Sequence, residues 1–287
     1  MIAVLKHELK LYFNSMTAWV FGAFLLLFIG LGSMLYNLQA AVSNFEFVLE
    51  FASMIFVVIV PVLTMRVIAE ERKQKTDQLL YSLPISTAEV VMGKYFALLA
   101  VYLVPLCFIG IYPLIFSQFG EVYLLTAYGT MVAFFIMGAA LIALGVFISS
   151  LTENQGLAAG IGIAVILFNY FSVSLAEYVS SNSFGNVMAI FAVIVAFAFI
   201  VLHLTKNEIA ACIVAAVSMI AVMVMYFVNT SAFEGLLPNI MSKLSLYDRF
   251  YTFVNGAFDL TAIVYYISFA VFFLLLSVQS MEKRRYN

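Results

Sequence analysis

Apolar residues run along this chain in long unbroken stretches. Eight of these stretches approach or exceed the 20 or so residues that a helix needs to cross a hydrocarbon core of roughly 30 Å. They cover residues 17–36, 51–69, 95–116, 122–149, 157–176, 186–204, 209–229 and 260–281, with charges near their ends. No segment alternates apolar and polar residues as the strands of a membrane barrel do. The pattern therefore predicts an all-α polytopic membrane protein.

The sixth and seventh stretches are separated by residues 203–208 alone. They are predicted either as two full spans or as one re-entrant pair. The prediction is thus six to eight transmembrane helices, with eight favoured. Either even number places both chain termini on the same side of the membrane.

Lysine and arginine indicate which side that is, because the loops that stay in the cytoplasm are enriched in them. With the N-terminus inside, eleven of the 13 basic residues fall inside, and Lys243 and Arg249 fall outside. The inside set is Lys6, Lys10, Arg66, Arg72, Lys73, Lys75, Lys94, Lys206, Lys283, Arg284 and Arg285. Both termini are therefore predicted to be cytoplasmic.

Composition narrows the class of protein further. Hydrophobic residues make up 65% of the 287 positions, charged residues make up 10%, and the mean hydropathy is +1.11. Soluble domains carry about 25% charged residues. These values exclude a cytosolic enzyme, a secreted disulfide scaffold and a disordered chain, and the net charge of −2 excludes a nucleic-acid binder. Cys107 and Cys212 lie inside apolar stretches, so neither a disulfide framework nor a metal cluster is expected. No cofactor is expected for the chain either.

The first polar segment, residues 1–16, shows helical spacing of apolar side chains with basic ones between them. The apolar set is Leu5, Leu9, Tyr12 and Phe13, and the polar set is Lys6, His7, Lys10 and Asn14. This pattern is typical of an amphipathic helix that lies in the membrane interface. A basic leader that only sets topology is the alternative.

The second polar segment, residues 70–94, is the most charged part of the chain. Its first part is predicted to continue the second span as a helix, with an apolar patch at Leu79, Leu80 and Leu83. Pro84 then breaks that helix. Ser86, with Glu89 three residues on, forms a capping-box motif that begins a new helix. A solvated loop without a partner is the alternative to a docking role for this helix–proline–helix segment.

The third polar segment, residues 230–259, lies between the last two spans on the predicted outer side. Leu236, Leu237, Ile240 and Leu244 share one helical face, which predicts a short amphipathic helix on the outer leaflet. Together the three segments and the spans are predicted to form a single transmembrane domain over residues 1–287.

No charged residue falls in the middle of a predicted span, which argues against an ion-coupled carrier. Arg66 and Lys94 lie near cytoplasmic ends, where long side chains are expected to reach the interface. A G-x-x-x-x-G-K-[ST] nucleotide-binding loop is missing. Around Gly93-Lys94, the position of the first glycine holds Ala88 and the position of the serine or threonine holds Tyr95. The chain itself is therefore not expected to be an enzyme.

Small residues gather in the fourth and fifth spans. Gly156 and Gly160 have the G-x-x-x-G spacing that lets two helices approach closely. Packing within the chain and a seam between two subunits are both open as explanations.

Several short segments resemble one known family. The stretch after the second span reads Arg66-Val67-Ile68-Ala69-Glu70-Glu71-Arg72-Lys73, Thr76, Leu79-Leu80, Leu83-Pro84-Ile85-Ser86, Glu89-Val90-Val91 and Gly93-Lys94. Three further segments are Tyr12-Phe13-Asn14-Ser15, Ser149-Ser150-Leu151-Thr152-Glu153-Asn154-Gln155, and Phe258-Asp259-Leu260 with the closing Glu282-Lys283-Arg284-Arg285. They resemble ABC-2 type transporter permeases, in particular the gliding-motility-type exporter branch. Residues 177–230 depart from the six-span pattern of that family and add a helix pair.

The resemblance implies the permease subunit of an ATP-binding-cassette exporter in a bacterial plasma membrane. It implies a homodimer or pseudodimer, cytoplasmic ATPase subunits as partners, and a membrane-anchored auxiliary protein as a candidate third component. It also implies that the loop after span two carries a coupling helix, and that this helix binds in a groove of the ATPase. The residues that would form or support that contact are Glu70, Glu71, Arg72, Thr76, Asp77, Leu80, Pro84 and Glu89.

The leading hypothesis is thus an exporter subunit that moves an unidentified substrate with ATP hydrolysed by a separate subunit. A self-sufficient secondary transporter without an ATPase is the main alternative. A non-transporting scaffold or an intramembrane enzyme is the third hypothesis, and the missing catalytic motifs disfavour it.

Overall fold

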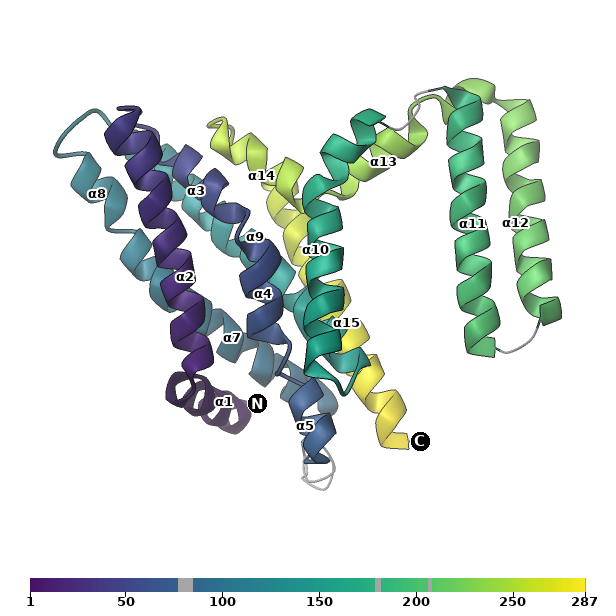
Figure 1. Ribbon diagram of the computed structural model, residues 1–287, viewed down its shortest axis with the longest axis horizontal. Helices are drawn as coiled ribbons and strands as arrows, with labels where there is room; N and C mark the ends of the chain where they lie inside the picture. The colour runs from purple at the N-terminus through teal and green to yellow at the C-terminus, as the bar shows by residue number, and fades with distance from the viewer. Residues whose placement is uncertain (77–84, 179–181, 206–207, 287) are drawn as a thin grey trace. The chain divides into compact units, whose positions relative to one another are not determined.

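The computed structural model describes residues 1–76, 85–178, 182–205 and 208–286 (Figure 1). Within these ranges the chain is helical, without strands. It forms two compact units: residues 1–170 with 249–287 make unit 1, and residues 171–248 make unit 2. The predicted all-α class is confirmed, while the predicted single domain over 1–287 stays a prediction.

Unit 1 holds most of the long helices. Its elements are α1 (Ile2–Asn14), α2 (Met16–Gly32), the π-helical segment η1 (Ser33–Gln39), α3 (Glu46–Ser53), α4 (Phe56–Thr64), α5 (Ala69–Gln74), α7 (Thr87–Ile109), α8 (Tyr112–Phe116), α9 (Leu124–Leu151), α10 (Gln155–Tyr178), whose last turns belong to unit 2, and α15 (Leu260–Tyr286). Helix α14 (Leu246–Val254) crosses from unit 2 into unit 1.

Five helical stretches in the described residues are long and apolar enough to cross a membrane. They are Met16–Gln39, Thr87–Phe116, Leu124–Leu151, Gln155–Tyr178 and Leu260–Arg284. The pair Glu46–Ser53 and Phe56–Gln74, bent by 58°, passes the same test as a sixth if it forms one broken span; a re-entrant loop has the same pattern. A multi-pass membrane protein is thereby confirmed.

The second predicted span, 51–69, begins later than the helices that the structure shows there, and those helices are two rather than one. Helix α3 begins at Glu46, and the chain breaks after Ser53. The Ser53 hydroxyl donates to the Glu50 carbonyl at 2.6 Å, a local bond of the kind that bends helices. Pro61 inside α4 removes a further backbone donor. The first residue of α3, Glu46, is buried although it carries a carboxylate.

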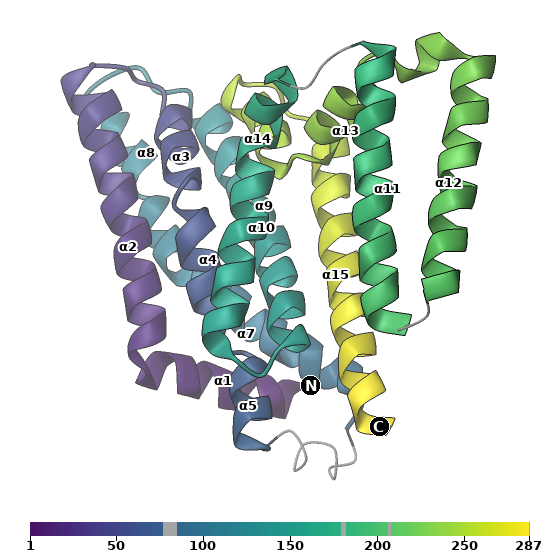
Figure 2. The same ribbon diagram turned by 45° about the vertical axis from the view of Figure 1, so that its right-hand side comes forward.

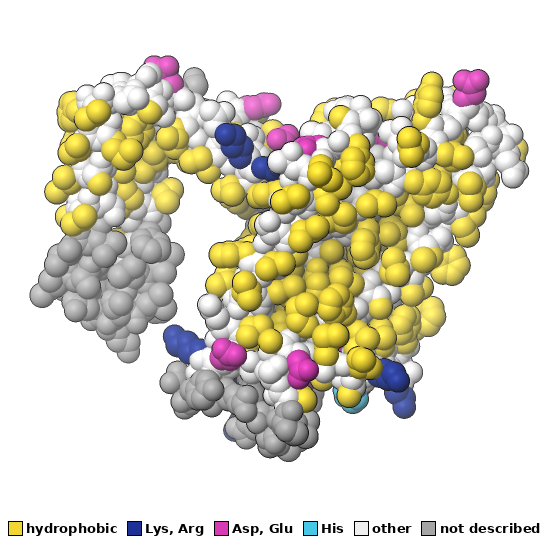
Figure 3. Space-filling model, turned by 180° about the vertical axis from the view of Figure 1, so that it is seen from behind, with side chains coloured by type: hydrophobic (Ala, Val, Ile, Leu, Met, Phe, Trp, Pro, Cys, Tyr) yellow, Lys and Arg dark blue, Asp and Glu magenta, His cyan; other side chains and the backbone are white. Residues whose placement is uncertain are grey.

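Both ends of the chain in unit 1 lie at the same end as α5 and the start of α7 (Figures 1 and 2). We call this the terminal end of unit 1. Helix α1 lies across it, at a steep angle to α2 and the other long helices (Figure 2). On the face shown in Figure 3, hydrophobic side chains cover the middle of unit 1, and charged side chains lie at its two edges. This banding is the surface that a bilayer-embedded protein presents.

Helix α9 forms the centre of unit 1, with α15, α4, α3 and α7 packed around it. Glycine makes the close approach possible, because a Cβ at Gly145 would lie 2.2 Å from Thr64 Oγ1. A Cβ at Gly138 would lie 2.6 Å from the ring of Tyr102, whose hydroxyl donates to the Phe134 carbonyl at 2.9 Å. Small residues in α9 therefore serve packing within the chain.

Unit 2 contains the paired helices α11 (Ser183–Thr205) and α12 (Glu208–Val228), the 3₁₀ segment η2 (Thr230–Phe233) and α13 (Leu236–Leu244). These two paired helices cover the residues of the sixth and seventh predicted spans, and whether they are two full spans or one re-entrant pair stays a prediction. Asn186 joins α11 to α13 by accepting from the Leu237 backbone N–H at 3.2 Å. Residues 230–259 thus hold η2, α13 and α14 where one amphipathic helix was expected.

Candidate functional site

The N-terminal helix is fixed to the start of α7 by a close contact. A Cβ at Gly93 would lie 3.0 Å from Val4 Cβ and 3.2 Å from the Met1 carbonyl oxygen. A larger residue at position 93 would push α1 away, so glycine here allows the two helices to touch. Helices α1 and α7 form one of the larger helix–helix contacts of unit 1.

The buried side of α1 differs from the predicted apolar face. Its buried residues are Glu8 and Tyr12, while Leu5 and Leu9 are half-buried and Phe13 is exposed. The helix itself is confirmed, and its place in a membrane interface stays a prediction. A carboxylate is found on the buried side because a buried cation faces it.

That cation is Lys94 on α7, whose side chain is 1% exposed. Its ammonium group donates to Glu8 Oε1 at 2.6 Å, to Glu71 Oε1 at 2.7 Å and to the Val67 carbonyl at 3.1 Å. The expectation that Lys94 reaches the interface is therefore wrong: three acceptors hold it inside. These three bonds use all three donors of a lysine. We call Glu8, Lys94 and Glu71 the lysine triad.

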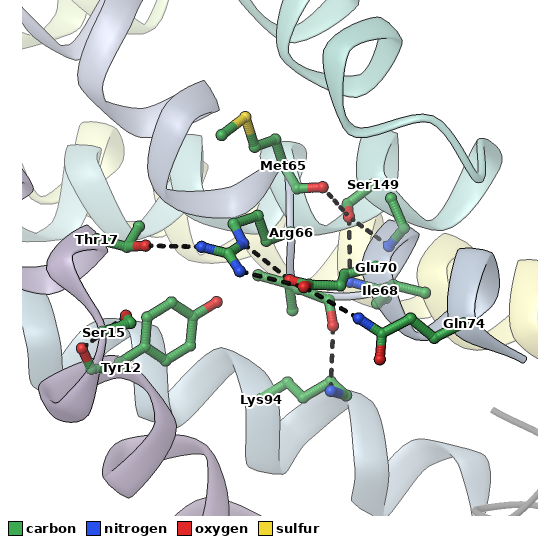
Figure 4. Close-up of polar contacts among 12 residues, drawn as sticks. Tyr12, Ser15, Thr17, Met65, Arg66, Ile68, Glu70, Gln74, Lys94 and Ser149 are labelled. Carbon is green, nitrogen blue, oxygen red and sulfur yellow. Dashed lines mark hydrogen bonds and ion pairs between the residues drawn. The ribbon is translucent and has the colours of Figure 1, made fainter. Parts of the chain in front are cut away.

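Arg66 lies beside the triad and behaves differently (Figure 4). Its Nε and Nη2 donate to the two carboxylate oxygens of Glu70 at 2.8 and 3.1 Å, and Nη1 donates to Thr17 Oγ1 at 3.4 Å. This fork-shaped pair is half-exposed and joins two residues four apart in one segment. Burial raises the pKa of the nearby Tyr12 phenol well above its usual range, and the Glu8 carboxylate adds to the rise. Tyr12 is therefore neutral at physiological pH.

Ser149, in the last turn of α9, closes the break between α4 and α5. Its hydroxyl accepts from the backbone N–H groups of Ile68 and Ala69, both at 3.1 Å, and donates to the Met65 carbonyl at 3.2 Å (Figure 4). The first backbone N–H groups of a helix have no partner within that helix. One side chain of α9 thus holds the N-terminal end of α5 in place.

The start of α7 has the predicted capping box. The Glu89 backbone N–H donates to Ser86 Oγ at 3.2 Å, and the Ser86 N–H donates to Glu89 Oε2 at 3.4 Å. The next residue, Thr87, donates to Glu282 Oε1 of α15 at 2.8 Å. These bonds confirm the predicted helix start and tie it to the C-terminal helix.

A groove of about 770 Å³ opens between α1 and α5 at the terminal end. Its apolar lining includes Val4, Leu11 and Ile85. Charged side chains of the lysine triad, Arg66 and Glu70 also line it. A groove of this kind, apolar with a few fixed charges, suits a protein segment that carries both apolar and charged side chains.

The predicted coupling residues are partly brought together. Glu70, Glu71 and Arg72 belong to α5, and Thr76 lies just after it. Glu89 is exposed on the first turn of α7, and Asp77, Leu80 and Pro84 lie outside the described residues. Arg72 is buried, and Glu71 belongs to the triad. Lys73 and Gln74 are the exposed side chains of α5.

Glu8 and Lys94 were missed as site residues. One signal was available: Glu8 falls between Leu5 and Tyr12 at helical spacing, so an acidic residue occupied the predicted apolar face. Its partner is 86 positions away, and no local pattern connects the two.

The predicted small-residue seam is on α10. Gly160 is exposed, with nothing within 4 Å of a Cβ built there, and Gly156 is exposed beside Asn154. Gly162, on the other side, meets Pro61 of α4 at 3.0 Å. Contacts inside the described part of the chain therefore do not explain Gly160.

Comparison with known proteins identifies the family. A family model described as ABC-2 family transporter protein matches residues 2–187, which is well over half of the chain. That range includes α1, α5 and α7, and with them all three residues of the lysine triad. Neither a curated protein nor a solved structure matches the chain significantly. The chain therefore belongs to the ABC-2 family of transporter proteins and is a membrane transport component.

Proposed function

We propose that this chain is the permease subunit of an ATP-binding-cassette exporter, driven by ATP that separate ATPase subunits hydrolyse. The observation that carries the proposal is the terminal end of unit 1, where α5 and a groove of about 770 Å³ lie together in a member of the ABC-2 family. The cargo is an unidentified substrate, and the membrane is a bacterial plasma membrane. The resemblance to gliding-motility-type permeases makes an auxiliary membrane protein a further candidate partner.

The terminal end is proposed to face the cytoplasm. Eleven of the 13 basic residues fall on that side if all eight predicted spans cross the membrane. Helices α11 and α12 have 23 and 21 residues, so at 1.5 Å per residue each is about 30–35 Å long, enough for a crossing. We therefore propose eight spans with both termini in the cytoplasm.

The ATPase is proposed to contact α5, the groove and the adjoining loop. Lys73 and Gln74 are exposed on α5 and Glu89 is exposed at the start of α7, so these side chains are accessible to a partner. On the opposite side of α5, Arg72 is buried and Glu71 accepts from Lys94, so these two residues hold α5 against the rest of unit 1. Asp77, Leu80 and Pro84 would complete the contact in the coupling loop.

A charge reversal on the exposed side of α5 tests this contact. In a Lys73→Glu/Lys75→Glu variant, we expect at least a tenfold loss of ATPase co-purified with the permease, because rim charges set partner choice and association rate. The matched control is Lys6→Glu/Lys10→Glu, which reverses two exposed charges on α1. A photo-crosslinker at Gln74 identifies the captured subunit by the nucleotide-binding sequence of its peptides.

Unchanged ATPase binding in the α5 variant contradicts the proposed contact. Substrate uptake by the purified permease alone, in liposomes with an ion gradient, would instead favour a self-sufficient secondary transporter. The two outcomes are distinct because the second requires no ATPase at all.

A second permease copy is proposed to pack on α10 through Gly156 and Gly160. Gly160 is open in the single chain, and Leu157 and Ile161 beside it are exposed apolar residues. Exposed glycine at G-x-x-x-G spacing lets the backbones of two helices approach.

A further inference from the structure

We propose that Lys94 ties α1 to α5, so that both helices and the start of α7 move as one body. The proposal rests on the proposed function, because an ATPase acting on α5 supplies the motion. In this proposal Lys94 is a positioning residue, and α1 is one of the helices that move when the ATPase moves α5.

The geometry of the lysine triad supports this tie. Glu8 comes from α1, Glu71 from α5 and Lys94 from α7, and the Val67 carbonyl lies just before α5. If α5 moved away from α7, the buried ammonium would lose two of its three acceptors. A buried charge without its partners is costly, so motion that keeps the triad intact is favoured.

The other ion pairs described at this end are more exposed to water. The Met1 ammonium group and Glu89 Oε1 lie 3.8 Å apart and join the start of α1 to α7, and both side chains are 48% exposed. Arg66 and Glu70 belong to one segment, four residues apart, and their side chains are 40% and 29% exposed. Arg284 and Glu153 join α15 to the turn after α9, with side chains 38% and 56% exposed. Water competes for such pairs, whereas Lys94 is 1% exposed.

Helix α1 passes the motion on to α2. The two helices meet at Ser15, whose hydroxyl donates to the Tyr12 carbonyl at 2.9 Å. Trp19 Nε1 on α2 donates to the Phe13 carbonyl of α1 at 3.0 Å. Motion of α5 would therefore reach α2 through Lys94 and α1, in addition to α4, which precedes α5 in the chain and packs against α2.

The tie itself is tested without an ATPase, because Trp19 is the single tryptophan of the chain and lies at the junction of α1 and α2. In vesicles, acrylamide quenching of Trp19 should rise at least twofold in Lys94→Met, in which both carboxylates lose the cation. Lys6→Met, which removes an exposed lysine of α1, is the matched control and should quench like the wild type.

A triple Glu8→Met/Lys94→Met/Glu71→Met variant separates a tie from general misfolding. Apolar residues of similar size often replace a buried ion cluster without loss of packing. We expect this variant to return Trp19 quenching to within about 20% of the wild-type value. Wild-type quenching in Lys94→Met, or quenching that stays high in the triple variant, overturns the tie.

The shared motion is tested in the ATPase complex by hydrogen exchange, with and without ATP and vanadate. In the wild type, peptides covering residues 2–14 and 69–74 should change exchange together, each by at least twofold. In Glu8→Gln the change at 69–74 should persist, and the change at 2–14 should be lost.

The two proposals fail in different ways in this experiment. An unchanged 69–74 peptide in the wild type removes the proposed function, and with it the motion inferred here. A response at 2–14 that persists in Glu8→Gln overturns the inference alone, because α1 would then move without its carboxylate on Lys94.

Discussion

Helices α9 and α10 follow one another in the chain, and both are apolar and rich in glycine and alanine, yet their surroundings differ. In the most apolar window of α9, 72% of the residues are buried, against 22% in that of α10. Gly138 and Gly145 of α9 receive side chains from α7 and α4, whereas Gly160 of α10 meets nothing within 4 Å. Hydropathy therefore does not tell a central helix from a peripheral one in a membrane protein, where both surroundings are apolar.

The comparison predicts the largest effect at Gly145. Its built Cβ lies 2.2 Å from Thr64 Oγ1 and 2.8 Å from Thr64 Cβ, so Gly145→Ala must separate α9 from α4. We expect a loss of about 3 kcal/mol, the upper part of the range for overpacked cores. Unfolding in mixed detergent micelles measures it. A loss below about 1 kcal/mol would show that the helices separate freely.

A second effect concerns Ser149 at the end of α9. In Ser149→Ala the buried N–H groups of Ile68 and Ala69 lose their acceptor, which should cost about 2 kcal/mol. Ser150→Ala is the matched control, because the Ser150 hydroxyl donates within its own helix, to Phe147. Equal unfolding free energies for the two variants would contradict a special role for Ser149.

A smaller effect is expected at Gly162, the glycine of α10 that does meet another helix. A Cβ there lies 3.0 Å from Pro61 Cβ and 3.3 Å from Pro61 Cγ, and a proline ring does not rotate away. We expect Gly162→Ala to lose about 1 kcal/mol in the same unfolding assay. A gain in stability would mean that α10 shifts without cost.

The smallest effect on the single chain is expected at Gly160. Gly160→Ala meets open space and gains helix propensity, so the unfolding free energy should rise by up to about 1 kcal/mol. If α10 forms the proposed seam, Gly160→Ile should weaken dimerisation at least tenfold, as measured by energy transfer between labelled copies in vesicles. Dimers that resist this substitution place the seam elsewhere.

The sequence predicted those features that depend on local pattern. The apolar stretches located helices, and Ser86 with Glu89 located the start of α7, because a capping box is complete within four residues. The break of the second span at Ser53 was missed, since the serine forms its bond inside an apolar run where hydropathy stays high.

The candidate site was only half predictable for the same reason. Glu70 and Glu71 stand in one charged run, and the run itself marked α5 as a polar helix. Lys94 looked like an ordinary basic residue at a span end, because its partner Glu8 lies 86 positions earlier. Distant pairing of this kind depends on tertiary packing, here on Gly93 bringing α1 to α7.

The order of residues in the lysine triad has a consequence for the biogenesis of the protein. Glu8 and Glu71 precede Lys94 in the chain, so a ribosome delivers both carboxylates before the ammonium group that they neutralise. Insertion of the third span can then begin with its counter-charges already waiting at the membrane surface. A truncated or rearranged chain that lacked both Glu8 and Glu71 would have to insert the same helix with an uncompensated cation.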